Sequence, residues 1–157
     1  MKKTFLILLL LTISLPVLSQ TYKLESVYSD MQNYLSYWKP LENTPNSGEE
    51  EFSLWGYQEY FDDAVNGMYE VQYFKGNTQE IFNFLQGIVD FTKKYEDQDN
   101  TLTYINRVKI KTLKKLGIKR TLVFDPEGKV AIPFNGKQWE KILEDLIDYC
   151  NENGISI

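Results

Sequence analysis

The side chains that could carry out chemistry form a short list in this chain of 157 residues. There is no histidine, and Cys150 is the single cysteine. These two facts exclude a Ser-His-Asp or Cys-His catalytic pair, a histidine zinc ligand and a dithiol redox pair. Carboxylates, lysines, tyrosines and hydroxyls remain, but the sequence places no two carboxyl groups at the separation that glycoside hydrolysis requires. We therefore predict that the protein is not an enzyme and that it uses no cofactor and no metal.

Basic residues gather in residues 100–124, where there are seven basic and no acidic side chains. Val108 and Ile110 alternate with Lys109 and Lys111, and this period of two predicts a strand on which Arg107, Lys109 and Lys111 share one face. Such a stripe could meet an acidic protein, an anionic glycan or lipid headgroups, and the alternative is an ordinary solvated sheet face. The candidate partner-binding residues are Arg107, Lys109, Lys111, Lys119 and Arg120.

A second candidate surface combines aromatic and acidic residues. Its candidate ligand-binding residues are Trp55, Tyr57 and Tyr60. The carboxylates near them in the sequence are Glu49, Glu50, Glu51, Glu59, Asp62 and Asp63. Exposed Trp and Tyr beside carboxylates could stack on sugar rings or anchor a protein partner. The alternative is that these aromatic residues form a core with a charged rim.

Hydrophobic periodicity predicts three helices. Apolar residues recur at spacings of three and four over residues 22–39 and 78–95, as expected for helices with one buried face. Asn77 and Glu80 form a capping-box pattern at the start of the second. The third helix is predicted over residues 136–150, after a candidate cap at Asn135 and before Asn153 and Gly154.

Strands are predicted in two regions. Asn66 and Gly67 lie between aromatic-rich segments and predict a β-hairpin within residues 51–75, although residues 57–65 also fit a short helix. Residues 101–134 predict a three-stranded meander with a tight turn at 125–128.

These elements together predict the fold class. We expect an α+β domain in which three helices pack on an antiparallel sheet built from the hairpin and the meander. Residues 40–50 hold two prolines, two asparagines, a serine and a glycine, and are predicted to be a flexible loop. No internal repeat is evident in the sequence, so residues 20–157 are expected to form a single domain.

The first residues resemble a secretory signal peptide. Lys2 and Lys3 precede an apolar run from Phe5 to Leu18, and a small residue, Ser19, lies at the expected cleavage site. The run has about 14 residues, fewer than the roughly 20 that span a bilayer. Cleavage near Ser19 would give a periplasmic or secreted protein of 138 residues with a side-chain charge of −7 and no transmembrane segment.

Export bears on Cys150 and on the class of partner. A single cysteine allows no intrachain disulfide, so Cys150 is either a buried thiol or half of an intermolecular bridge. An exported protein with net negative charge is a poor candidate for binding nucleic acid. A protein partner in the cell envelope suits these properties better.

One segment resembles a known family. Residues Lys115 to Val130, "KLGIKRTLVFDPEGKV", with the helix after them, are similar to the last third of a thioredoxin-like domain. Arg120 precedes Thr121 where that family has a cis-proline, and residues 75–80 hold no cysteine where a Cys-x-x-Cys would stand. The resemblance therefore implies a redox-inactive relative, whereas the alternation at 108–111 predicts a strand where that family has a helix.

Three functions follow from the sequence. The preferred one is an exported, non-catalytic module that binds a partner protein, as an immunity protein or an inhibitor does. The second is a glycan- or envelope-binding module that uses exposed aromatic residues. The third is the redox-inactive thioredoxin-like domain, which requires a parallel central sheet and a helix over residues 107–116.

Overall fold

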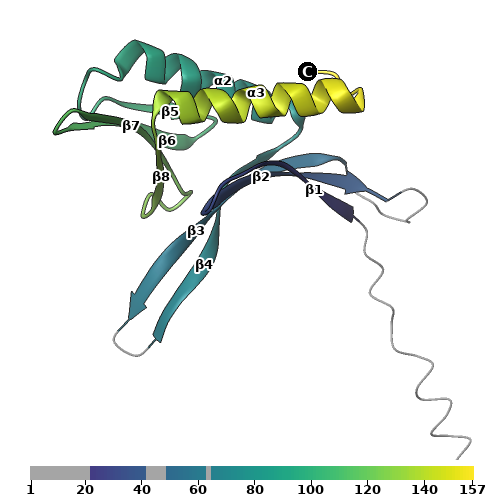
Figure 1. Cartoon of the computed structure of the whole chain (residues 1–157), viewed down its shortest axis with the longest axis horizontal. Helices are drawn as coiled ribbons and strands as arrows, with labels where there is room; N and C mark the ends of the chain where they lie inside the picture. The colour runs from purple at the N-terminus through teal and green to yellow at the C-terminus, as the bar shows by residue number, and fades with distance from the viewer. Residues whose placement is uncertain (1–21, 42–48, 63–64) are drawn as a thin grey trace, which may run out of the picture.

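Two four-stranded antiparallel sheets and two helices make up the described part of the chain (Figure 1). The computed structural model describes residues 22–41, 49–62 and 65–157, but not the side chains of residues 58–67. Sheet A consists of β1 (Tyr22–Ser29), β2 (Asn33–Pro40), β3 (Glu51–Asp62) and β4 (Val65–Gly76), and is followed by α2 (Thr78–Tyr95). Sheet B consists of β5 (Leu102–Ile105), β6 (Val108–Lys115), β7 (Ile118–Phe124) and β8 (Ala131–Phe134), and is followed by α3 (Gly136–Asn153).

This architecture corrects the predicted fold class. The chain is α+β in the broad sense, but the described residues form eight antiparallel strands in two sheets with two helices, where three helices on one sheet were expected. The same order of four strands and a helix occurs twice, a repetition that the sequence did not reveal.

The predicted helix at residues 22–39 is wrong, since β1 and β2 form a hairpin there. The turn is made by Asp30, whose Oδ1 accepts hydrogen bonds from the backbone N–H groups of Gln32 at 2.7 Å and Asn33 at 2.6 Å. An aspartate that bonds to nearby amides in this way stabilises a turn and interrupts a helix. The flanking strands contain four Tyr, one Trp and one Val, and these residue types favour strands.

The β3–β4 hairpin is present, but its turn is not at Asn66 and Gly67, which lie inside β4. Asp62 pairs with Val65, and the described residues of the 57–65 segment lie in β3 and β4 rather than in a helix. β2 pairs with β3 only as far as Gly56, where an added Cβ would lie 2.6 Å from Asn33 Oδ1. The hairpin therefore continues beyond the body of sheet A as a two-stranded arm, visible at the lower left of Figure 1.

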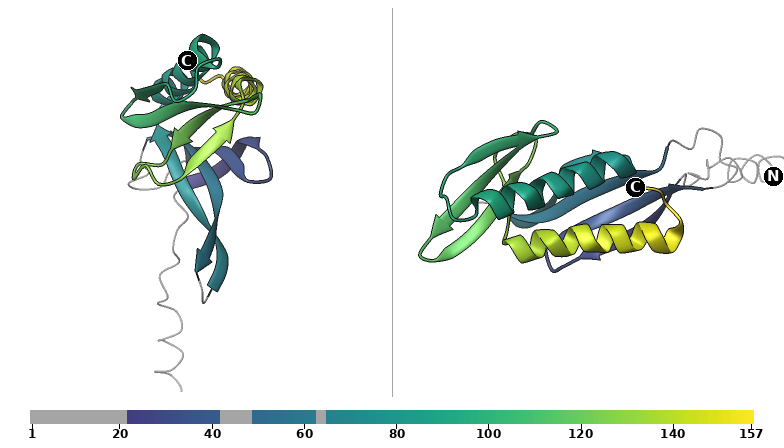
Figure 2. Two further views of the ribbon diagram at one scale, coloured as in Figure 1. Left: turned by 90° about the vertical axis from the view of Figure 1, so that its left-hand side faces the viewer. Right: turned by 90° about the horizontal axis from the view of Figure 1, so that it is seen from above.

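The two helices form one layer over both sheets. They lie side by side and run in opposite directions, as Figure 2 shows from above. α2 contacts strands of both sheets, and α3 contacts α2 and β1. Buried residues of sheet A such as Leu35 and Phe52 belong to one hydrophobic cluster with Ile110 and Val123 of sheet B.

Both helix starts were predicted correctly. The Asn77 side chain accepts a hydrogen bond from the backbone N–H of Glu80, and the Glu80 carboxylate accepts one from the backbone N–H of Asn77, each at 2.9 Å. Asn135 and Gln138 repeat this capping box at α3. A capping box satisfies two amides that the first helical turn leaves unpaired, so its sequence pattern locates a helix start reliably.

Sheet B has one strand more than the predicted three-stranded meander. β5 pairs with β6 across a turn at Asn106 and Arg107, whose φ angles are 47° and 68°. Two successive positive φ angles are typical of a tight hairpin turn, but Arg rarely adopts one, so this turn could not be recognised from the residue types. The predicted turn at 125–128 is confirmed, with Gly128 at a φ of 71°.

The thioredoxin-like hypothesis is not supported. β6 occupies most of residues 107–116, where a helix was required, and every strand pair in the two sheets is antiparallel. The predicted signal peptide and residues 42–48 of the predicted loop lie outside the described residues. No helix in the described ranges is long and apolar enough to cross a membrane.

Candidate binding surface

Aromatic side chains cover the side of sheet A that faces away from the helices. Leu35, Tyr37, Phe52 and Leu54 point into the core and are at most 3% exposed. Since side chains alternate along a strand, their neighbours in β2 and β3 lie on the opposite side, together with residues of β1. We call this surface the aromatic face; it consists of Tyr22, Leu24, Tyr34, Trp38, Trp55 and Tyr57.

The rings of the aromatic face contact one another across strands. Tyr34 is the cross-strand partner of Trp55, and their rings are nearly parallel with centroids 6.3 Å apart. Tyr57 lies 5.9 Å from Tyr34 on one side of this pair, and Tyr22 meets Trp38 edge-on at 6.3 Å. Cross-strand aromatic pairs stabilise a sheet, so these rings form a preorganised surface.

Two indole groups in the aromatic face have no hydrogen-bond partner. The Nε1 atoms of Trp38 and Trp55 are shielded from solvent and unpaired among the described residues. Ser36 and Ser53 form the cross-strand pair that lies between Trp38 and Trp55 on the same side of the sheet, and they are 3% and 1% exposed. A buried donor without a partner costs free energy, and native structures hold few of them.

Glu70 ties the tyrosines of the aromatic face to β4. The Tyr34 hydroxyl donates a hydrogen bond of 2.9 Å to Glu70 Oε1. Burial of Tyr34, followed by this hydrogen bond to a carboxylate, raises the pKa of its phenol, and hydrogen bonding to Glu70 also raises the pKa of Tyr57. Both phenols therefore stay protonated at neutral pH and act as hydrogen-bond donors rather than as bases.

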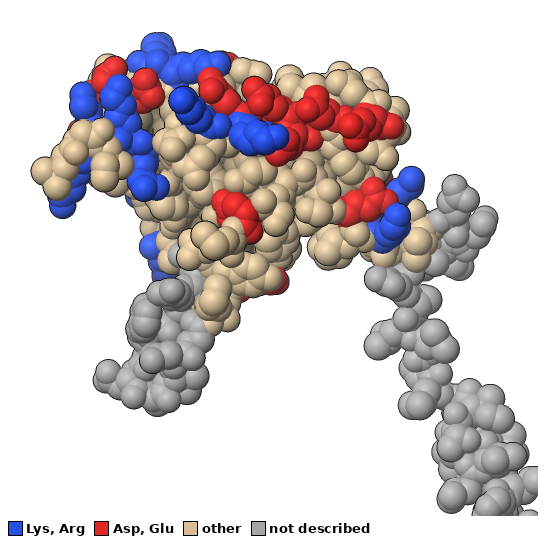
Figure 3. Space-filling view, viewed as in Figure 1, with Lys and Arg blue, Asp and Glu red and all other residues tan. Residues whose placement is uncertain are grey.

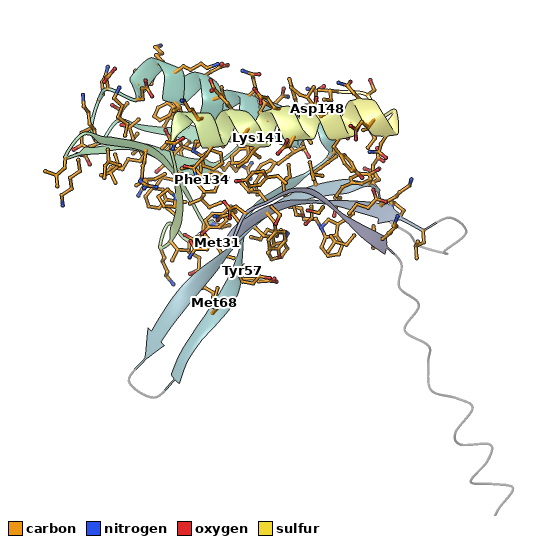
Figure 4. The ribbon with its side chains drawn as sticks, viewed as in Figure 1. Met31, Tyr57, Met68, Phe134, Lys141 and Asp148 are labelled. Atoms are coloured by element: carbon orange, nitrogen blue, oxygen red, sulfur yellow. The ribbon has the colours of Figure 1, made fainter. Side chains whose placement is uncertain are left out.

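Two methionines extend this surface where the arm leaves sheet A. Met31 in the β1–β2 turn is 96% exposed and Met68 in β4 is 60% exposed. Figure 4 shows both close to Tyr57 in the projected view, and the Tyr57 backbone N–H donates to Gln32 O at 2.6 Å, which places the turn beside β3. Exposed methionines next to aromatic rings are typical of adaptable protein-binding surfaces.

A cleft separates the arm from sheet B. It has a volume of ≈ 710 Å³ and is lined by residues 68–72 of β4 and, opposite them, residues 125–130, except Gly128, of the β7–β8 turn. We call it the junction cleft. Its apolar walls include Met68, Val71 and Val130, and its polar lining includes Glu70 and Asp125.

The predicted stripe of Arg107, Lys109 and Lys111 is only partly present, because Arg107 lies in the β5–β6 turn and not in a strand. Lys109 and Lys111 share the outer side of β6, as the alternation indicated, and the Lys109 Nζ lies 4.5 Å from the centre of the Phe124 ring. Arg120 also lies on this outer side and donates to Pro133 O at 2.6 Å. Arg107 is exposed in the β5–β6 turn.

Lys119 is separate from this group, since it points to the helix side of the sheet. Its Nζ lies 2.8 Å from Asp97 and 3.6 Å from Glu96, at the end of α2. Hydrogen bonds from Lys119 and then Lys114 lower the pKa of Asp97, and the bond to Asp97 raises the pKa of Lys119. The C-terminal end of α2 therefore neutralises part of the predicted basic surface.

Charge remains unevenly divided between the sheets. Residues 22–76 carry 3 basic and 10 acidic side chains, whereas residues 101–135 carry 8 basic and 2 acidic ones. In Figure 3, Lys and Arg gather at the sheet B end and carboxylates line the exposed side of α3. A partner would therefore meet surfaces of opposite sign on the two sheets.

Other reactive groups in the described residues are engaged within the fold. Cys150 is fully buried, and burial raises the pKa of its thiol. Tyr37 donates to Glu50 and Tyr149 donates to Glu25. No group of three metal-ligating side chains occurs in the part of the chain that the structure describes.

The structure describes the side chains of two of the three predicted ligand-binding residues. Trp55 and Tyr57 are neighbours on the aromatic face, whereas Tyr60 is in β3 but its side chain falls outside the described part. Tyr34 and Trp38 were missed because residues 22–39 were assigned to a helix. The turn residues Asp30 and Asn33 were the available signal for a hairpin there. Comparison of the chain with known protein families, with curated proteins and with solved structures found no match.

Proposed function

We propose that this chain is an exported, non-catalytic binding module whose aromatic face recognises a partner protein. The observation that carries this proposal is the preorganised layer of Tyr and Trp rings on the side of sheet A that the helices leave uncovered. Trp and Tyr supply large contact areas at low conformational cost and dominate the energetics of many interfaces.

Three features support a protein partner over a glycan. The exposed Met31 and Met68 border the surface, and methionine suits apolar contacts with a protein more than contacts with sugar hydroxyls. The unpaired indole N–H groups of Trp38 and Trp55 are shielded from solvent, so they are poorly placed to bind a sugar without rearrangement. Sheet A is also strongly acidic, which adds electrostatic steering towards a basic partner.

Quantitative affinity capture tests the proposal. The mature chain is immobilised and incubated with an extract of the source cell envelope, and retained proteins are measured by mass spectrometry. The aromatic variant Trp38→Ala/Trp55→Ala is compared with the matched sheet B variant Lys109→Ala/Lys111→Ala, and both are checked for folding by circular dichroism. The retained protein is then purified and its Kd measured against each variant.

We expect the aromatic variant to weaken binding at least about tenfold, the usual scale of losing an interface anchor. The lysine variant is expected to bind like the wild type. Equal binding by the aromatic variant, or loss confined to the lysine variant, would contradict the proposal. A glycan array tests the alternative function. If the wild-type chain binds a glycan on the array and Trp55→Ala loses that binding, the aromatic face is assigned to glycans instead.

A further inference from the structure

β4 has an open edge along the junction cleft. It is the last strand of sheet A, and no strand in the described ranges pairs with its outer side. Unpaired backbone N–H and C=O groups on an edge strand are a template for another strand. This edge therefore offers a means of binding that the aromatic face alone does not.

The register identifies which backbone groups face the cleft. The Tyr57 N–H donates to Gln32 O, so the backbone groups of Tyr57 point away from β4. Because hydrogen-bonded and non-hydrogen-bonded pairs alternate in an antiparallel ladder, its partner Glu70 must point its own N–H and C=O away from β3. The N–H and C=O groups of Met68 and Gln72, two residues before and after Glu70, point away from β3 in the same way. Met68, Glu70 and Gln72 all line the junction cleft.

The arm has a physical reason to accept another strand. Beyond Gly56 it consists of β3 and β4 alone, and an isolated two-stranded hairpin is marginally stable in water. Met68 and Tyr69 lie on opposite sides of this ribbon and are 60% and 42% exposed. An added strand would become the third strand of the arm and would cover part of both of its sides.

The charges of the cleft select the occupant. Among the described residues that line it, Glu70, Asp125 and Glu127 are acidic and Lys129 is basic; Lys129 lies 2.5 Å from Glu127. Asp125 is 8% exposed and holds the opposite wall in place by accepting hydrogen bonds from the backbone N–H groups of Lys129 and Val130. The lining therefore has two negative charges in excess, which favours a basic segment.

The same charges disfavour a second copy of this chain. Residues 57–70 contain four acidic and no basic residues. Pairing two β4 strands around a two-fold axis would bring these acidic segments together, and like charges across an interface are unfavourable.

We propose that a basic, extended segment of the partner protein adds to the edge of β4 as a third strand of the arm, within the junction cleft. Its main chain bonds to Met68, Glu70 and Gln72, and its apolar side chains contact Met68 and Val71. The proposal rests on the proposed function in taking a protein as the ligand, and it adds the mode of binding and the chemistry of the bound segment.

Titration with designed octapeptides tests this. The probe is acetyl-Lys-Val-Lys-Val-Lys-Val-Lys-Val-amide, and its control replaces Lys with Glu. Two further versions of the basic peptide carry N-methyl groups on alternate amides, one on the Lys and one on the Val residues. Since alternate residues of a strand face the same neighbour, one version must lose binding to β4 and the other must keep it.

A matched pair of protein variants tests the edge itself. Met68→Pro removes an outward N–H, whereas Met68→Ala removes the same side chain and keeps the N–H. Loss of this bond and the local change in the strand are expected to weaken peptide binding about tenfold in Met68→Pro relative to Met68→Ala. If Met68→Pro does not fold, the two N-methylated peptides decide the question on the wild-type chain.

The outcomes separate the two proposals. Equal binding of the two N-methylated peptides, of the acidic and basic peptides, or of the two folded Met68 variants would overturn edge addition. A wild-type dimer in sedimentation that Met68→Pro abolishes would also overturn it, in favour of a second copy. Trp38→Ala lies away from the cleft lining, so it is expected to bind the peptide normally even though it weakens capture of the whole partner.

Discussion

Sheet A and sheet B share an architecture and differ in chemistry. Each is a four-stranded antiparallel meander followed by a helix of 18 residues that starts with a capping box. The outer side of sheet A carries packed aromatic rings on an acidic segment, whereas the outer side of sheet B carries lysine and arginine. The buried sides are alike, because both pack against the same helical layer.

The two sheets also differ in how many of their functional groups have partners within the described chain. Several basic groups around sheet B are engaged within the chain: Lys119 with Asp97, Arg120 with Pro133 O, and Lys109 over Phe124. In sheet A, two indole N–H groups have no partner among the described residues, and two methionines are exposed. Polar groups without hydrogen bonds and exposed apolar side chains concentrate at functional sites, so sheet A is the stronger candidate for recognising a partner.

Replacing Trp139 by Ala tests whether the two sheets unfold as one unit. Among the substitutions considered, it should lower the free energy of unfolding most. Trp139 is fully buried, contacts Phe134 of sheet B with ring centroids 5.2 Å apart, and extends from α3. Removing it should lower the free energy of unfolding by about 3–5 kcal/mol. Urea unfolding followed by circular dichroism and by tyrosine fluorescence should give one shifted transition. Separate transitions for the two probes would show that the sheets unfold independently.

Changing each of the three tryptophans to Phe compares the indole N–H groups of sheet A with that of Trp139. Trp139 Nε1 donates to Thr121 O at 3.2 Å, so Trp139→Phe should cost about 1–3 kcal/mol through the lost bond and the space left behind. Trp38→Phe and Trp55→Phe remove donors that have no partner in the described part of the chain, and are expected to change stability by less than about 1 kcal/mol. Thermal denaturation of the three variants measures this. Equal losses in all three would mean that the indole N–H groups of sheet A are as well satisfied as that of Trp139.

A buried hydroxyl pair gives a smaller test on the sheet B side. Thr121 Oγ1 lies 2.8 Å from Thr92 Oγ1, which itself donates to Ile88 O. Thr121→Val keeps the shape and removes one hydrogen bond, so a loss of about 1 kcal/mol is expected. Thr121→Ser, which retains the hydroxyl, is the control for the bond. A Val variant as stable as the wild type would show that the pair contributes nothing to the junction of α2 with sheet B.

The smallest effect is expected at the exposed pair of Asp97 and Lys119. The pKa of Asp97 is lowered in the folded state by hydrogen bonds to Lys119 and Lys114, so its contribution is present above the unfolded pKa. That contribution is lost as the pH falls below about 4 and passes through the folded pKa. The Tm difference between the wild type and Asp97→Asn should therefore shrink on acidification. A difference that is constant between neutral and acidic pH would show that the charge of Asp97 has no role.

What the sequence predicted well was local. Asn77 with Glu80 and Asn135 with Gly154 located both helices, because caps depend on neighbouring residues. The helix predicted for residues 22–39 was wrong because the apolar residues there fit both a helix and two strands. The turn at Asp30 is the feature that distinguishes the hairpin from a helix. The open edge of β4 could not be predicted, since it depends on the order of strands in sheet A, in which β4 is last and has no strand of the described ranges on its outer side.

The candidate site shows the same limit. Trp55 and Tyr57 were selected correctly as neighbours, but their partner Tyr34 comes from a strand that the sequence assigned to a helix. Lys119 was grouped with Lys109 and Lys111 by composition, whereas strand parity and the acidic end of α2 place it elsewhere. Pairing across strands is a long-range property, and one sequence contains little information about it.

The indole N–H resonances of the three tryptophans report whether a partner protein binds at the aromatic face. In a ¹⁵N–¹H spectrum each gives one signal, and Trp139 serves as the internal reference because it is buried between α3 and sheet B. During titration with the purified partner protein, we predict that the signals of Trp38 and Trp55 shift while that of Trp139 stays in place. Saturable binding that leaves the Trp38 and Trp55 signals unmoved would contradict the assignment of recognition to sheet A.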